Sequence, residues 1–416
     1  MGRLTDFLTV RGKAFLAAGV VLLLAGLGLG VVDLTRIGVL TIALPLIAST
    51  VIRRHRLALV VSREVHPARV HTDEQCTVTL SVTNPDRQRT PMIMAEEFVD
   101  YALGDRPRFV IPTMRQGERR ILRYTVRSHA RGRHRLGPLG IRVRDPFGLT
   151  ARTAAHSGHA EVVVLPRVLP LAIARPKGSE LGAEGTIPHM VALHGEDDVS
   201  IREYRDGDDL RRIHWPATAR TGELMVRQED RPATRRATVL LDSRSSVHRS
   251  GGSSASFEWA VTATASIVAH LLDLGYAVHL LTSQPKAESR VHQDVDLEAA
   301  LDTLAEAALT GDESLADLLR SASSFTSSGG LVVAVTAAMD QDRVHALASL
   351  RQPGSNGLAF VIDPSRRGRS RDDDPAGATQ AALSNAGWSV QRVTAELTVP
   401  DAWRQVTGGE RMVVGR

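Results

Sequence analysis

Cysteine and lysine are almost absent from this chain of 416 residues. Its one cysteine, Cys76, excludes a disulfide within the chain, and with it the class of small secreted domains that disulfides hold together. Lys13, Lys177 and Lys286 are the only lysines, and aromatic residues make up 4% of the sequence. The net charge of +5 is carried by scattered arginines without interleaved aromatics, so we expect no nucleic-acid partner.

Motifs for nucleotide and zinc chemistry are missing too. The chain has no G-x-x-x-x-G-K-[ST] or G-x-G-x-x-G in a strand-turn-helix setting, no H-E-x-x-H and no pair of cysteines. His189 and His194 are off the i, i+4 spacing that places two ligands on one helix face. We therefore expect no cofactor, no bound metal and no nucleotide hydrolysis by this chain itself.

Two apolar runs near the N-terminus are long enough to reach across a membrane. The first, 14–32, holds about 19 uncharged residues, which at 1.5 Å per residue span a hydrocarbon core of roughly 30 Å. The second, 37–52, is about 16 residues long and contains Pro45, and Leu34 with a snorkelling Arg36 extends it. The runs predict a transmembrane hairpin over 1–56, the alternative being a secretory signal peptide.

Basic residues flank this hairpin on both outer sides. They are Arg3, Arg11 and Lys13 before the first run and Arg53, Arg54 and Arg56 after the second, with Arg36 alone between the runs. By the positive-inside rule both ends are cytoplasmic, which predicts a multi-pass protein of the cell membrane with cytoplasmic soluble domains. The second basic group is also suited to anionic lipid of the bilayer.

Residues 57–171 carry the period-two pattern of half-buried strands. Cys76, Val78, Leu80 and Val82 alternate with polar residues until Asn84, and similar runs occur at 121–126, 141–143 and 161–165. The pattern predicts a small β-sandwich with Cys76 in its core and not as a reactive thiol. In the turn that begins with Asp145-Pro146, Phe147 is expected to fill the end of the sandwich.

From residue 237 to 416 strands and helices alternate. Strands are predicted at 239–241, 277–281, 331–335, 358–362 and 389–393, and helices at 256–274, 297–308, 314–322, 342–350 and 377–386. Such alternation predicts a mostly parallel sheet with helices on both faces. Ligands of such sheets bind beyond the carboxyl ends of the strands, so Asp242-Ser243-Arg244-Ser245-Ser246 is the first place to look for a site.

Between these domains, 172–236 combines a linker with a dense polar run from Gly195 to Glu229. We predict a strand over 199–204, a turn over 205–207, a short helix capped by Asp208 and a second strand over 223–228. The run resembles the signature of the bacterial family called domain of unknown function 58, R-E-Y-x-x-G-D-D-x-R-x-I-x-W-x-x-x-A-R-x-G-x-L. The matching residues are Arg202, Glu203, Tyr204, Gly207, Asp208, Asp209, Arg212, Ile213, Trp215, Ala219, Arg220, Gly222 and Leu224. The D-P-F-G-L of 145–149 is similar to a feature of the same family.

Two interpretations of this signature follow from its side chains. Glu203 and Asp208 as paired carboxylates, with His214 as base, would suit catalysis. Neighbouring arginines favour instead a structural ion-pair network or a recognition surface, because they keep each acid ionised. Trp215 is expected to be buried, so that its removal lowers stability.

The segment after residue 237 resembles a von Willebrand factor A domain, whose members often bind a divalent cation through D-x-S-x-S and a later T-D-G. Asp242 and Ser246 match, but Arg244 replaces the middle serine, and Thr336 is followed by Ala337 where an aspartate is expected. A degenerate metal site is thus predicted at Asp242, Arg244, Ser246 and Thr336, with Asp340 as a possible substitute carboxylate. The Arg244 guanidinium either pairs with Asp242 in the metal position or points to solvent.

The sequence therefore predicts four parts: a transmembrane hairpin (1–56), a β-sandwich (57–171), a linker with the signature (172–236) and an α/β von Willebrand factor A-like, Rossmann-like domain (237–416). The resemblance implies a non-enzymatic adaptor or assembly factor that works with a MoxR-type AAA+ ATPase and a transglutaminase-like membrane protein. A metal-dependent ligand-binding module is the alternative, followed by an uncharacterised hydrolase.

Overall fold

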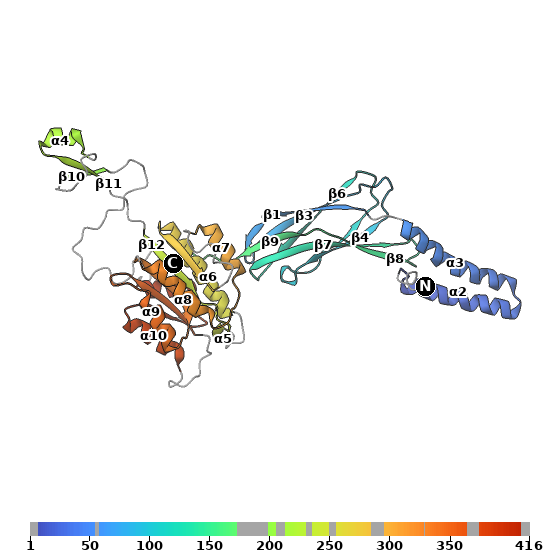
Figure 1. Cartoon of the computed structure of the whole chain (residues 1–416). Helices are drawn as coiled ribbons and strands as arrows, with labels where there is room; N and C mark the ends of the chain where they lie inside the picture. Colours follow the sequence, from blue (N-terminus) through green and yellow to red (C-terminus); the bar gives the residue numbers. More distant parts are fainter. Residues whose placement is uncertain are drawn as a thin grey trace, which may run out of the picture. The chain divides into compact units, whose positions relative to one another are not determined.

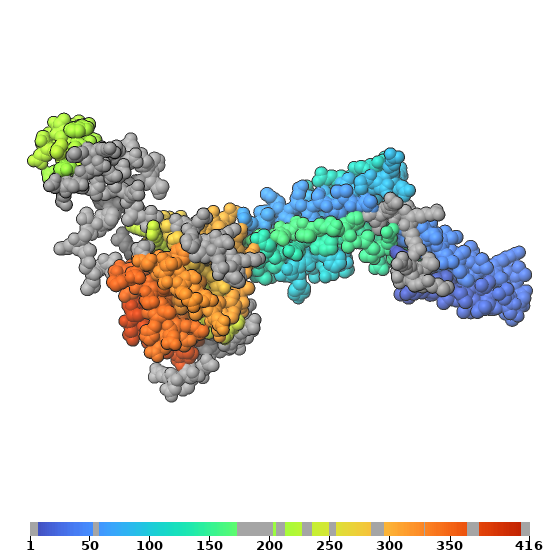
Figure 2. Space-filling model, in the orientation of Figure 1, coloured from blue at the N-terminus to red at the C-terminus, as the bar shows by residue number. Residues whose placement is uncertain are grey.

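The computed structural model describes residues 7–54, 58–172, 199–204, 213–229, 235–248, 255–283, 295–327, 329–363 and 374–408. The chain divides into two compact units, coloured along the sequence in Figure 1 and Figure 2. The first comprises Met1–Arg167 with Glu298–Ala307, and the second comprises Val168–Leu297 with Ala308–Arg416.

The first unit begins with an apolar helical hairpin, α2 (Val10–Leu29) and α3 (Val32–Arg54). Both helices are long and apolar enough to cross a membrane, with mean hydropathies of 2.0 and 1.8. A third helix, α6 (Ala255–Asp273), also meets that criterion, but most of it is buried in the second unit. The hairpin leaves large side chains such as Leu24 and Leu40 exposed, which suits a lipid solvent.

Glycines bring the two helices of the hairpin into close contact. Gly12, Gly19 and Gly26 are the buried residues of α2, seven positions apart. A Cβ at Gly19 would lie 2.7 Å from Ile42 Cγ1, and one at Gly26 would lie 2.6 Å from the Thr35 backbone nitrogen. Small residues at such positions let transmembrane helices approach closely.

Two sheets follow the hairpin. The smaller has the order β1-β3-β6, all antiparallel, and the larger has the order β2-β9-β7-β4-β5 with β8 paired to β7. Their bounds are β1 Val60–His66, β2 Arg69–His71, β3 Gln75–Thr83, β4 Ile93–Val99, β5 Arg108–Ile111, β6 Arg119–Arg127, β7 Gly132–Arg144, β8 Ala151–His156 and β9 Ala160–Leu165, with a 3-10 turn at Tyr101–Leu103. The β-rich domain predicted over 57–171 is thus present.

The two sheets pack face to face around two apolar clusters. The cluster near the hairpin combines Leu80 and Val82 of β3 with Ile93 of β4 and Ile141 of β7, and it includes Ile52 of α3. The distal cluster holds Val78, Leu136, Val162 and the predicted core cysteine, Cys76, which is 1% exposed. Burial raises the pKa of the Cys76 thiol, as expected of a core residue.

The expectation that Phe147 fills the end of this sandwich is wrong, because its side chain is 62% exposed. The Asp145 carboxylate accepts hydrogen bonds from the backbone nitrogens of Phe147 (2.8 Å) and Thr150 and from Thr150 Oγ1 (2.8 Å). This tight turn directs Leu149, 2% exposed, into the interior instead.

Helix α7 (Leu297–Glu306) groups with the first unit, although it follows β13 in the sequence. Arginines of the sandwich bind it: Arg69 pairs with Asp302 (2.8 Å), Arg133 Nε donates to Glu306 Oε1 (2.8 Å), and Arg131 donates to the carbonyl oxygens of Leu304 (3.0 Å) and Ala307 (2.6 Å). These long-range polar contacts were not predicted from the sequence.

The second unit is built on a five-stranded parallel sheet of order β13-β12-β14-β15-β16. The strands are β12 Arg236–Leu241, β13 Ala277–Thr282, β14 Leu331–Ala337, β15 Gly357–Ile362 and β16 Ser389–Val393. The helices are α5 Ser245–His248, α6, α8 Ser314–Thr326, α9 Gln341–Ser349, α10 Pro375–Asn385 and α11 Val399–Thr407. Every residue of β15 is buried, as expected of a central strand covered on both faces.

The predicted strands of this domain are all present, within a few residues of their expected bounds. Helices α5 and α11 were not predicted. In α11, Thr398 caps the first turn and Trp403 is buried, its indole nitrogen donating to the carbonyl oxygen of Ala172 (3.0 Å). A strand pair also belongs to this unit: β10 (Val199–Glu203) lies antiparallel to β11 (Met225–Glu229), with α4 (Trp215–Thr221) between them in sequence.

Candidate functional site

The order of the parallel strands identifies one position where a ligand would be expected. Numbered along the chain from β12, the order is 2-1-3-4-5, and the sheet changes direction between β12 and β14. In such doubly wound sheets, ligands bind beyond the carboxyl ends of the strands at this switch point. Asp242 directly follows β12, and Thr336 lies at the end of β14, so two of the predicted residues meet there.

The Arg244 side chain occupies this position. Its Nε donates to Asp242 Oδ1 (3.0 Å) and Oδ2 (3.2 Å), and its Nη2 donates to Asp242 Oδ2 (2.7 Å). The Arg244 and Asp242 side chains are only 3% and 1% exposed. Of the two orientations considered from the sequence, the structure therefore has the ion pair and not the solvent-facing arginine.

Further donors fill the remaining acceptor positions of the Asp242 carboxylate. Thr336 Oγ1 donates to Oδ2 (2.9 Å), as does the Ala337 backbone nitrogen (3.3 Å), and the backbone nitrogen of Arg244 donates to Oδ1 (3.1 Å). Burial would raise the pKa of Asp242, but the hydrogen bonds and charge of Arg244 outweigh it and hold that pKa below its usual range. The carboxylate is thus kept ionised inside the protein.

The guanidinium is also held from the far side, because Arg244 Nη2 donates to the carbonyl oxygen of Ala338 (3.0 Å) beyond β14. His248 of α5 lies beneath the same loop, with Nε2 3.2 Å from the Asp242 carbonyl oxygen and Nδ1 3.2 Å from Ser256 Oγ. A cavity of about 10 Å³ next to Asp242 has room for roughly one water at most. Arginine thus fills the position at which the topology of the sheet would place a ligand.

Ser246 and Asp340 do not join this pair. Ser246 Oγ donates to Asp312 Oδ1 (2.5 Å). Asp340 caps α9 by accepting from the Arg343 backbone nitrogen (2.9 Å), and it pairs with the Arg343 side chain. The expectation that Asp340 substitutes for the missing carboxylate next to Asp242 is therefore wrong, since the helix cap fixes the Asp340 side chain on Arg343.

One further segment reaches the site without having been predicted. Thr310 Oγ1 lies 2.9 Å from Ser243 Oγ and 2.8 Å from Ser314 Oγ, and its backbone nitrogen donates to the Ser243 carbonyl oxygen (2.7 Å). Together with Ser246 and Asp312, this segment adds hard oxygen atoms around the closed site. The Thr310-Gly311-Asp312 turn between two helices was the available sequence signal.

The signature residues are only partly described by the structure. Gly207, Asp208, Asp209 and Arg212 lie outside the described residues, and of Arg202 the structure describes the backbone. Glu203 ends β10, the Tyr204 backbone nitrogen donates to the Leu224 carbonyl oxygen (2.8 Å), and Arg220 lies exposed in the last turn of α4. The short helix described here begins at Trp215, and the ring nitrogen Nδ1 of His214 caps it by accepting from the Ala217 backbone nitrogen (3.1 Å).

His214 Nδ1 has a structural role in this helix cap. Trp215 is 66% exposed, so the expectation of a buried indole is wrong. It stands in the first turn of a two-turn helix beside a two-stranded sheet, where Val226 takes the interior position at 4% exposure.

Residues 200–354 match the family model described as Protein of unknown function DUF58. The match confirms the family resemblance of the signature and extends through the Asp242–Arg244 pair and Thr336. A relative, described as Uncharacterized protein YeaD of Bacillus subtilis (strain 168), is 23% identical over 226 residues. That alignment covers 51% of this chain and 53% of YeaD, so the chain spans about half the length of this relative.

Several solved structures are similar to about a quarter of the chain. The CARDB domain of a Pyrococcus furiosus protein is 13% identical with a TM-score of 0.19, covering 26% of this chain and 92% of that one. Spo0M, a sporulation control protein of Bacillus subtilis, is 15% identical with a TM-score of 0.16, covering 26% of this chain and 49% of that one. Scores this low support no conclusion about function.

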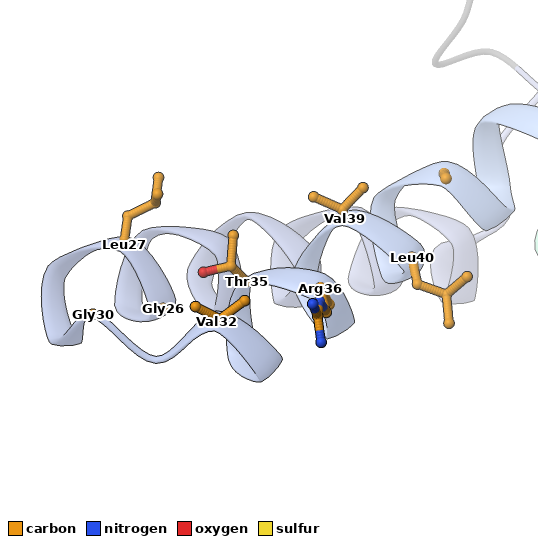
Figure 3. Close-up of a pocket in the computed structure, with 9 residues that line it drawn as sticks. Gly26, Leu27, Gly30, Val32, Thr35, Arg36, Val39 and Leu40 are labelled. Atoms are coloured by element: carbon orange, nitrogen blue, oxygen red, sulfur yellow. The ribbon is translucent and has the colours of Figure 1, made fainter.

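A second hollow lies on the hairpin and is shown in Figure 3. It has a volume of about 630 Å³ and is lined mainly by apolar residues of α2 and α3, among them Leu27, Val39 and Leu40. Arg36 at its edge pairs with Asp33 (3.1 Å). Because both helices are membrane-spanning candidates, this surface suits acyl chains better than a soluble ligand.

Proposed function

We propose that this protein is a membrane-anchored, non-enzymatic adaptor or assembly factor that acts with a MoxR-type AAA+ ATPase. One observation carries the proposal: Arg244 fills the position where a doubly wound sheet would bind its ligand, and it saturates Asp242. A domain with this position closed from within has no need of a cation or small molecule to reach its binding-competent form. Such a domain fits constitutive protein recognition better than catalysis.

The α/β unit is proposed to be von Willebrand factor A-like. The parallel order 2-1-3-4-5 supports this assignment, as does the placement of Asp242, Ser246 and the Thr310 segment around the end of β12. A buried Arg244 in place of the middle serine would make it a metal-independent member of that class. The MoxR-type partner and the transglutaminase-like membrane protein come from the DUF58 resemblance.

The hairpin is proposed to place both the β-sandwich and the α/β domain in the cytoplasm. Basic residues on the outer sides of the two apolar helices support that orientation. A reporter that is active only in the cytoplasm, fused after Arg416, should then be active. Activity from an exterior-specific reporter alone would refute the orientation.

Affinity purification of the full chain from native membranes tests the partner. An AAA+ ATPase should be recovered with the wild-type chain and lost with Trp215→Ala, which removes an exposed indole of the signature. Leu274→Ala is the matched control, since Leu274 is also exposed but lies at the end of α6. If the ATPase is recovered equally with both variants, α4 does not bind it. If the protein turns over a substrate and Trp215→Ala abolishes that turnover, the adaptor proposal is wrong.

A further inference from the structure

We infer that the end of the sandwich nearest the hairpin rests on anionic lipid headgroups. The inference depends on the proposed membrane anchoring and adds a second contact with the bilayer, made by the sandwich itself. The contacting residues, here called the lipid rim, are Arg87, Arg89, Met92, Arg115, Arg144 and Phe147.

The turn that carries Phe147 is bonded directly to the start of the first membrane-spanning candidate. The Thr9 backbone nitrogen donates to the Leu149 carbonyl oxygen (2.9 Å), and Thr9 Oγ1 donates to the Gly148 carbonyl oxygen (2.6 Å). Thr9 is also the N-cap of α2, which begins at Val10. The turn therefore lies at the level where the chain enters the bilayer.

Gly12 shows how closely turn and helix approach. A Cβ at this position would lie 2.1 Å from the Leu149 carbonyl oxygen, so only glycine permits the contact. On the opposite side of the turn, the Ala151 backbone nitrogen donates to the Phe7 carbonyl oxygen (2.8 Å). With the chain held on both sides, Phe147 is presented outward at a fixed height.

Strand register brings the other rim residues to the same end. Ile93 pairs with Val143 and with Ile111, so the loops before β4 and after β5 lie beside the end of β7 that leads to Asp145. Backbone hydrogen bonds join these two loops, from Thr90 to Met114 (3.0 Å) and from Gly117 to Asn84 (2.7 Å). The loops are thus an ordered surface that carries the rim arginines.

Exposed apolar side chains are concentrated in this half of the sandwich, which Figure 1 and Figure 2 show next to the hairpin. They are Val60, Met92, Met94, Val110, Ile121 and Phe147, whereas Tyr101 is the large apolar residue exposed at the distal end. Arginine outnumbers acid on the rim, where Asp86 and Glu118 are the neighbouring carboxylates outside the Asp145 turn. Apolar side chains surrounded by arginine suit a headgroup layer that carries negative charge.

Depth-dependent quenching on the full chain tests this inference. The native cysteine is first removed by Cys76→Ala, and this variant is checked for an unchanged melting transition. A polarity-sensitive fluorophore is then attached to one new cysteine at a time, introduced by Phe147→Cys, Met92→Cys, Tyr101→Cys or Leu24→Cys. The chain is reconstituted into phosphatidylcholine vesicles with and without phosphatidylglycerol, containing nitroxide lipids with a shallow or a deep quencher. Tyr101 is the control for water and Leu24, in the C-terminal half of the apolar helix α2, for the bilayer interior.

The expected result is a blue shift and shallow quenching at 147 and 92, deep quenching at 24 and neither at 101. If the fluorophore at position 24 is quenched while those at positions 147 and 92 behave like the one at position 101, the hairpin spans the membrane but the lipid rim lies in water or contacts another protein. The inference then fails, and the membrane anchoring of the proposed function stands. If 24 is not quenched either, the membrane anchoring of the proposed function fails with it.

Lipid charge is tested by the same readout. Replacing phosphatidylglycerol by phosphatidylcholine should weaken quenching at positions 147 and 92 and leave quenching at position 24 unchanged. The same weakening is expected in phosphatidylglycerol vesicles for the triple variant Arg87→Gln, Arg89→Gln, Arg115→Gln. The matched control is a triple variant of arginines farther from the hairpin, Arg106→Gln, Arg123→Gln, Arg127→Gln, which should leave the quenching unchanged. Quenching that ignores both lipid charge and the rim arginines would overturn the recognition of anionic headgroups.

Discussion

Two buried arginine-carboxylate pairs, one in each unit, share their chemistry and differ in their surroundings. In the sandwich, Arg63 Nε donates to Glu97 Oε1 (2.5 Å), and the two side chains are 3% and 0% exposed. In the α/β unit, Arg244 and Asp242 are 3% and 1% exposed. Arg63 and Glu97 belong to different sheets, whereas Arg244 and Asp242 stand two residues apart on one loop.

Burial alone therefore does not identify a functional site. The Arg63–Glu97 pair joins β1 to β4 across the sandwich interior, which is a structural role. The Arg244–Asp242 pair lies at the carboxyl end of a parallel sheet, where its topology places ligands. Position in the fold separates a structural ion pair from one that closes a site.

The largest effect is expected where the pair joins two sheets. Glu97→Ala leaves the buried Arg63 guanidinium without its carboxylate, which should lower the free energy of unfolding by about 3–5 kcal/mol. Glu96→Ala is the matched control, because the neighbouring Glu96 pairs with Arg108 at the surface and should cost less than about 1 kcal/mol. Chemical denaturation measures both, and equal losses would show that the Arg63–Glu97 pair has no special role.

Opening the α/β site should produce the next largest effect. Arg244→Ser with Ala337→Asp removes the guanidinium and adds a second carboxylate, so magnesium or manganese should raise the melting temperature. Ligand at about 100 times its dissociation constant stabilises a folded protein by about 2.7 kcal/mol. The wild-type chain should be indifferent to both ions, and a metal-dependent rise that Asp242→Ala abolishes would establish the metal-dependent alternative.

A smaller, pH-dependent effect is expected from His248 next to that site. Its pKa is lowered chiefly by burial, so below about pH 6.5 the unfolded chain binds a proton that the folded chain resists. Stability from this group is therefore present above that pH and lost as the pH falls through the folded pKa, by at most about 1.4 kcal/mol per pH unit.

The free energy of unfolding, measured between pH 7 and pH 5, tests this assignment. His248→Gln should reduce the slope of that free energy against pH. Ser256→Ala, which removes a partner of Nδ1 but keeps the imidazole, should retain it. Burial also lowers the pKa of His270, so part of the pH dependence of the free energy of unfolding should remain in the His248→Gln variant. An unchanged slope in the double variant His248→Gln, His270→Gln would refute the assignment.

The smallest change in stability is expected at Trp215. Its indole is 66% exposed, so Trp215→Ala should alter the free energy of unfolding by no more than about 0.5 kcal/mol. Val226→Ala, at a residue 4% exposed in the same strand pair, should cost more because it removes buried methyl groups. Thermal unfolding of both variants compares them, and a large loss at Trp215 would restore the burial expected from sequence.

Hydrophobic periodicity located every strand and most helices of the α/β unit, but only some strands of the sandwich. The alternation from Cys76 to Val82 became β3, and the β/α alternation after residue 237 became a parallel sheet whose strands match their expected bounds. Asp242 was identified by its position after a predicted parallel strand, and Thr336 by the resemblance to a von Willebrand factor A domain; the two side chains do meet at the same edge of the sheet.

Only the tertiary structure decided which partners the polar side chains take. Thr310 reached Ser243 across 67 residues, Ser246 paired with Asp312, and Asp340 was committed to a helix cap. Arg244 could face water or Asp242 by sequence alone, and packing around β14 selected the pair. Phe147 and Trp215 were expected inside because they are large and apolar, yet tight local elements hold both outward. Periodicity follows from one segment and its own backbone, whereas burial and pairing depend on which distant segments pack against each surface in the folded protein.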